Sequence, residues 1–169
     1  LAGSVTGASA RLTLPGPFAE GAMSNRVHVV CSNFILATGA RIDVTACGYL
    51  RDTGPGKGAG ASYGDGRLGY AFGPAYGSLT EPTDPGSGAT PGASASGHGG
   101  GAVRIEATNA VQIFGSILAN GGGRGGIHGH GGSGGSIFIT CRTLGGSAAG
   151  LLQARGESIS HGGISGGGG

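Results

Sequence analysis

Gly101-Ala-Val-Arg-Ile-Glu-Ala107 has a close counterpart in Gly135-Ser-Ile-Phe-Ile-Thr-Cys141. Both stretches place an apolar residue at every second position, and Arg26-Val-His-Val-Val-Cys31 has the same alternation. Successive side chains of a β-strand point to opposite faces, so a period of two predicts a strand with one buried face. The sequence therefore predicts three short strands of one kind.

Each predicted strand is followed by a second alternating run that ends in glycine. These runs are Val44-Thr-Ala-Cys-Gly48, Ile117-Leu-Ala-Asn-Gly121 and Leu152-Gln-Ala-Arg-Gly156. The unit is a strand, a short turn, a strand and a Gly-rich excursion, and it occurs three times. Because one unit can bury its apolar face only against its neighbours, the repeat favours an all-β fold, a parallel β-helix or β-solenoid. An antiparallel sandwich is the alternative, since the turns are long enough for either.

Stacked units would align equivalent residues in apolar columns. The predicted columns consist of Val27, Val29, Cys31, Val44, Val103, Ile105, Ile117, Ile137, Ile139, Cys141 and Leu152. Around them the chain divides into four parts. Residues 1–25 would form an entering edge or cap, 26–48 the first repeat, 49–100 an insert rich in Gly, Pro and Tyr, and 101–169 the second and third repeats.

Glycine dominates the composition, with 43 residues of 169. That is about a quarter of the chain, against roughly 7% in ordinary proteins. Glycine loses more backbone freedom on ordering than any other residue, so ordered Gly segments need compensating contacts. One arrangement that would supply such contacts is close packing of Gly segments on one another, as extended helices of about three residues per turn resembling polyglycine II. The alternative is a set of loops ordered by local turns.

Four segments carry a resemblance to known proteins. They are Ala40-Arg-Ile-Asp-Val-Thr-Ala-Cys-Gly48, Tyr76-Gly-Ser-Leu-Thr-Glu-Pro-Thr-Asp-Pro-Gly-Ser-Gly88, Gly99-Gly-Gly-Ala-Val-Arg-Ile-Glu-Ala107 and Gly131-Gly-Ser-Gly-Gly-Ser-Ile-Phe-Ile139. As an ordered set they resemble the glycine-rich repeat regions of very large secreted or cell-surface proteins of bacteria and protists. The resemblance begins near Val27 and implies a β-helical surface or extracellular segment. It implies no reaction.

Charge and hydropathy exclude several classes of partner. The formal net charge is only +2, and no basic cluster suggests a nucleic-acid surface. No apolar run approaches the roughly 18 residues of a membrane-spanning helix, so no membrane insertion is predicted. The partners we expect are further modules of the same assembly, by self-association, with a glycan as a further candidate.

Few residues suggest chemistry. His128, His130 and His161 lie in Gly-rich excursions that stacking could bring together, which would suit Zn or Cu. Since no Cys or carboxylate accompanies them, loop histidines without a metal are favoured, and no cofactor is predicted. The three Cys form no Cys-x-x-Cys pair, and Cys31 and Cys141 fit small buried residues. The eight acidic residues form no recognisable catalytic pair, so no catalytic residue is predicted.

The long insert contains spaced aromatic residues, Tyr63, Tyr70, Phe72 and Tyr76 among them. Such rings could stack on sugars or anchor a protein, or they could pack onto the stack of strands. The leading hypothesis is a structural module of an extracellular fibre, surface appendage or adhesive stalk. A carbohydrate- or protein-binding adhesin module that uses the insert is the first alternative. A β-helix carbohydrate-active enzyme is the second.

Overall fold

The computed structural model describes residues 2–5, 10–20, 26–63, 72–91, 96–123, 129–158 and 164–168, with side chains from residue 10 onward. This part of the chain holds nine strands and no helix. The strands are β1 (Ala2–Val5), β2 (Arg11–Leu12), β3 (Arg26–Leu36), β4 (Arg41–Asp43), β5 (Ala102–Ile113), β6 (Ser116–Leu118), β7 (Ser136–Thr140), β8 (Thr143–Gly146) and β9 (Leu151–Gln153). The fold is therefore all-β, as the alternation predicts. Within the described residues, no helix is long or apolar enough to cross a membrane.

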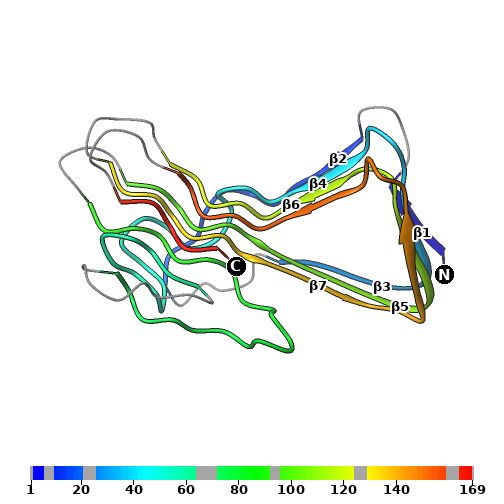
Figure 1. Ribbon diagram of the computed structural model, residues 1–169, viewed down its shortest axis with the longest axis horizontal. Coiled ribbons are helices and arrows are strands. Elements are labelled where there is room, and N and C mark those ends of the chain that lie inside the picture. Colours follow the sequence, from blue (N-terminus) through cyan, green and yellow to red (C-terminus); the bar gives the residue numbers. More distant parts are fainter. Residues whose placement is uncertain are drawn as a thin grey trace.

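The strands form two parallel sheets. One has the order β1-β3-β5-β7, with β8 also paired to β5, and the other has the order β2-β4-β6-β9. Every pairing between these strands is parallel, which leaves no place for the antiparallel sandwich. Along the chain the strands belong to the two sheets in alternation, with β7 and β8 both pairing with β5. Each turn of the chain therefore extends both sheets. In Figure 1 the strands of successive turns lie nearly over one another and outline a triangle.

The register of the strands aligns apolar residues from turn to turn. Leu12, Ile42, Ile117 and Leu152 face one another in sequence along β2, β4, β6 and β9. The two inner members are 0% exposed, whereas Leu12 is 38% and Leu152 45% exposed. Burial along this column therefore depends on having a neighbouring turn on each side, as in a repeat structure whose units contact only their neighbours.

The other residues of the predicted columns lie as follows. Val27, Cys31, Val44, Val103, Ile105 and Ile117 are buried, while Val29, Ile137, Ile139 and Cys141 are partly buried and pack against the same cluster. The less buried Ile137, Ile139 and Cys141 all follow β5 in the chain, in or next to the last turn. Leu152, in that turn too, is exposed, and none of the described strands lies over it on the side away from β6.

Two features lie beyond the predicted units. β3 and β5 continue past the expected alternation, through an irregularity in register between Cys31 and Asn33, and add Phe34 and Val111 to the core. On β3 the buried positions step by three residues from Cys31 to Phe34, so a strict period of two misses Phe34. The extra residue of the bulge lies on β5, where Val111 stays in phase with Ala107. In addition, residues 1–25 contribute β1 and β2, which pair with β3 and β4 as part of the two sheets.

Candidate functional site

The Gly-rich segments form a second body of structure beside the strands. We call it the glycine layer; its residues are 45–50, 86–89, 97–101, 119–122, 130–135, 156–157 and 164–167. In Figure 1 these segments leave one corner of the triangle and run side by side without forming strands. They are joined by backbone hydrogen bonds, for example from Gly48 N to Gly99 O at 2.7 Å and from Gly97 N to His130 O at 2.7 Å.

The hydrogen bonds of residues 131–135 follow a period of three. The five backbone N–H groups donate in turn to Ile164 O, Gly122 O, Ser87 O, Gly167 O and Ala119 O. The first and fourth bonds reach one neighbouring segment, the second and fifth reach another, and the third reaches a third. A β-strand alternates between two neighbours, whereas this segment bonds to three in rotation. The layer is thus cross-linked in several directions by its own backbone.

Close backbone approach explains why these positions are glycine. A Cβ atom on Gly132 would collide with the carbonyl of His98, and one on Gly99 with the carbonyl of Gly86. A Cβ on Gly86 would meet the carbonyl oxygen of Gly134. The obstacle in each case is backbone, which cannot rotate away as a flexible side chain can. Any larger residue would therefore push the segments apart and lengthen their hydrogen bonds.

Two serines tie segments of the glycine layer together. Ser87 N donates to Ser133 Oγ at 2.8 Å, and Ser133 N donates back to Ser87 O at 3.1 Å. Both residues are fully buried. Ser87 Oγ in turn accepts from Gly56 N at 2.9 Å and donates to the hydroxyl of Tyr76 at 3.0 Å. These buried hydrogen bonds connect the insert, residues 49–100, to the neighbouring segments of the glycine layer.

Tyr76 supports a test of this connection. Its hydroxyl donates to Pro85 O at 2.6 Å and accepts from Ser87, and burial raises the pKa of Tyr76 well above the ordinary 10.0. Tyr76→Phe leaves Pro85 O and Ser87 short of a partner, so we expect a loss of about 1–2 kcal/mol in the free energy of unfolding. Urea titration measures it. Tyr63→Phe is the matched control, because the buried Tyr63 hydroxyl makes no hydrogen bond within the described residues.

The raised tyrosine pKa also predicts an alkaline limit to stability. A group that binds its proton more tightly in the folded state contributes fully below its unfolded pKa, here 10.0. That contribution is lost as the pH rises through the folded pKa. Burial also raises the pKa of Tyr49 and Tyr63. We therefore expect the unfolding free energy to fall above pH 10, less steeply in Tyr76→Phe. A parallel slope in the two proteins would contradict the assignment to Tyr76.

Of the aromatic residues proposed as ligand contacts, Tyr63 is buried, whereas Phe72 and Tyr76 are half-buried. Tyr63 is 2% exposed and meets Tyr76 edge to face at 5.0 Å between ring centroids. Tyr49 packs against Phe18 at 4.9 Å, and a Cβ on Gly60 would collide with the ring of Phe72. Tyr70 lies outside the described residues. Tyr63 and Tyr49 are therefore closed to a ligand by contacts within the chain, while Phe72 and Tyr76 keep part of their surface exposed.

Of the predicted metal ligands only His130 lies within the described residues, whereas all three cysteines do. His128 and His161 lie outside the described residues, and His130 Nδ1 is 2.9 Å from Thr90 O. Within the described ranges no three His, Cys, Asp or Glu side chains form a metal-binding group. All three cysteines are free thiols. Cys47 is buried, and desolvation raises the pKa of its thiol.

The strand-borne carboxylates have basic partners. On β5, Glu106 Oε1 lies 2.7 Å from His28 Nε2 and 2.6 Å from Arg104 Nε, and these hydrogen bonds lower the pKa of Glu106. On β4, in the other sheet, Asp43 pairs with Arg11 at 3.0 Å. The two carboxylates belong to different sheets and each is neutralised locally, so they do not form the facing pair that glycoside hydrolysis uses.

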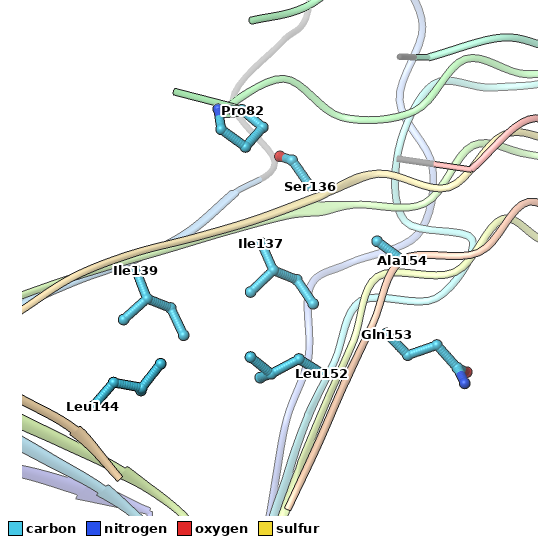
Figure 2. A pocket seen from close by; sticks show the side chains of 8 residues that line it. All are labelled: Pro82, Ser136, Ile137, Ile139, Leu144, Leu152, Gln153 and Ala154. Atoms are coloured by element: carbon cyan, nitrogen blue, oxygen red, sulfur yellow. The ribbon is translucent and has the colours of Figure 1, made fainter. Parts of the chain in front are cut away.

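The last turn of the stack ends in an apolar hollow. It has a volume of about 320 Å³ and is lined by Pro82, Ser136, Ile137, Ile139, Leu144, Leu152, Gln153 and Ala154. Figure 2 shows the isoleucines of β7 and the leucines of β8 and β9 converging on the same space. The hollow is the place where a further turn of strands would put its inward side chains.

No protein-family model matches the chain, and no similar protein was found among curated sequences or solved structures.

Proposed function

We propose that the protein is a structural module of an extracellular fibre, surface appendage or adhesive stalk. In this proposal the two sheets form a β-solenoid, and the glycine layer is a bundle of polyglycine-II-like segments attached to it. The observation that carries the proposal is the rotation of the hydrogen bonds of residues 131–135 among three neighbouring segments. An extended helix of three residues per turn presents its N–H groups in three directions in this way.

The bonding pattern suits a mechanical role. Each segment of the layer is held laterally by several others, so a local break leaves the remaining bonds in place. The buried Ser87–Ser133 pair adds bonds between segments without leaving a polar group unsatisfied. Low charge in the chain also favours close contact between modules, since few charges would have to be desolvated. A surface location is proposed from the resemblance to secreted and cell-surface proteins.

Electron microscopy of native source material, labelled with an antibody against this chain, tests the proposal. Label along regular filaments, with a constant axial repeat, is the expected result. Label confined to discrete particles would contradict a structural polymer. A non-immune antibody of the same class is the control for label that adheres to fibres without recognising the chain.

A further inference from the structure

A second hollow opens among segments of the glycine layer, and we call it the glycine-layer hollow. Its volume is about 590 Å³, within the roughly 300–1,000 Å³ that is usual for small-molecule sites. It is lined from four separate stretches of the chain, at residues 17, 46–51, 96–98 and 122–123. Apart from glycines, its lining combines apolar and polar residues, namely Pro17, Ala46, Leu50, Arg51, Ser96 and His98.

Both ionisable side chains that line the glycine-layer hollow are basic. They are Arg51 and His98, and no acidic side chain of the described residues lines it; Asp52, which follows Arg51, is outside the lining. Arg51 is exposed and takes part in none of the ion pairs found in the described part of the chain. A guanidinium group presents planar donors that match a carboxylate, so this lining favours a ligand that carries one.

The backbone around Arg51 is held in one arrangement. Arg51 N donates to Nδ1 of His98 at 3.0 Å. Thr53 N donates to Leu50 O at 3.1 Å, which closes a turn with Arg51 at its second position. The guanidinium group therefore extends from a fixed corner of the chain, and His98 acts as a positioning residue for it.

Strained backbone is concentrated beside the same hollow. Ala46, which lines it, has a φ of 57°, and Asp52 has a φ of 60°. Within the described residues these are the non-glycine positions with positive φ. Side chains other than glycine rarely adopt this conformation, and residues held in it cluster at binding sites. The two angles therefore point to the hollow as a functional part of the molecule.

Ser96 contributes a hydroxyl that has no partner. The residue lines the hollow and is 5% exposed, and its Oγ makes no hydrogen bond within the described residues. A buried hydroxyl without a partner destabilises a protein, and a hydrogen bond with a ligand would remove that cost. Pro17 and Leu50 add apolar surface to the lining. A ligand with hydroxyl groups, C–H faces and a carboxylate suits all of these features.

We propose that the glycine-layer hollow binds an acidic saccharide. Arg51 binds the carboxylate of the sugar, Ser96 bonds to one of its hydroxyl groups, and the apolar residues pack against its C–H face. The proposal goes beyond the structural role and does not rest on it. A module with such a site would bind both its own assembly and an acidic glycan.

Titration of the labelled protein with tri-galacturonic acid, followed by nuclear magnetic resonance of the backbone amides, tests the proposal. We expect saturable shifts at residues 50, 51, 97 and 98, with a Kd of about 1 mM or tighter. The methyl ester of the same trimer lacks the charges, so it should bind at least about tenfold more weakly. Absence of saturable shifts at these residues, or equal binding of the ester, would overturn the proposal. This comparison uses the wild type, so it needs no variant to fold.

Two substitutions assign the binding to named side chains. Arg51→Gln should bind the trimer at least about tenfold more weakly, whereas Arg142→Gln, an exposed arginine outside the lining, should bind as the wild type does. Ser96→Ala should bind about fivefold more weakly without any loss of stability to urea, because its hydroxyl has no partner in the described residues. Unchanged binding in Arg51→Gln or in Ser96→Ala would overturn the proposal.

Two further probes identify the ligand. Sodium sulfate at the same concentration should not produce the shifts, and equal shifts with sulfate would mean a general anion site and overturn the proposal. Free galacturonic acid separates two sources of the same chemistry. Weaker binding than the trimer assigns the hollow to a polysaccharide, equal binding assigns it to a single sugar acid, and both support an acidic saccharide. Because the titration does not depend on filaments, its result is independent of the microscopy that tests the structural role.

Discussion

Ile117→Asp is expected to prevent folding. Ile117 is 0% exposed and lies between Ile42 and Leu152 in the column. An aspartate there would be either an unpaired charge or an unpaired acid in an apolar contact. The loss should be at least about 5 kcal/mol, which is the whole stability of a small domain. Circular dichroism and urea titration measure the result, and we expect no cooperative transition.

Leu152→Asp is the matched control for that substitution. It changes the last member of the same column among the described strands, where the side chain is 45% exposed and the carboxylate can reach water. We expect a loss of about 1 kcal/mol or less from this exposed position. If both variants unfolded, or neither did, burial would not depend on neighbouring turns in the way described.

Gly132→Ala has the second largest expected effect. The added methyl group would collide with the backbone carbonyl of His98, and Gly132 is buried between segments. Because backbone must move to make room, we expect a loss of about 3 kcal/mol or more in the free energy of unfolding. The same substitution should weaken the bond from Gly132 N to Gly122 O. Urea titration of the purified protein measures the loss.

Gly145→Ala provides the comparison. Gly145 is exposed on β8, nothing lies within 4 Å of a Cβ placed there, and its backbone is not in the left-handed region. Alanine should reduce the freedom of the unfolded chain and leave stability unchanged or raised by about 0.5 kcal/mol. Equal losses at the two positions would mean that glycine matters for backbone freedom alone and not for close packing.

The alternation of apolar residues predicts much of the sheet. Val103, Ile105 and Ile117 follow a strict period of two and lie in the core. Phe34 could not be found in this way, because the buried positions of β3 step by three residues from Cys31 to Phe34. Leu12 could not be predicted as a member of the column either, because β2 has only two residues and so shows no alternation.

The arrangement of segments in the glycine layer is harder to predict from the sequence. High glycine content predicts close packing, but glycines carry no side-chain pattern that tells which segments are neighbours. The partners of Gly131 and Gly135 are set by backbone geometry and by the strands that position each segment. Ser87 and Ser133 were the available signal, because small polar residues within a Gly-rich stretch can pair when buried.

Hydrogen exchange of individual backbone amides, followed by nuclear magnetic resonance, tests the central claim most directly. The account predicts that the five amides of residues 131–135 exchange at least about a thousandfold more slowly than in an unstructured peptide, which corresponds to an opening free energy of about 4 kcal/mol. The amides of β5 serve as the internal reference for protected backbone. Slow exchange in β5 combined with free exchange in residues 131–135 would contradict a glycine layer held together by its own backbone.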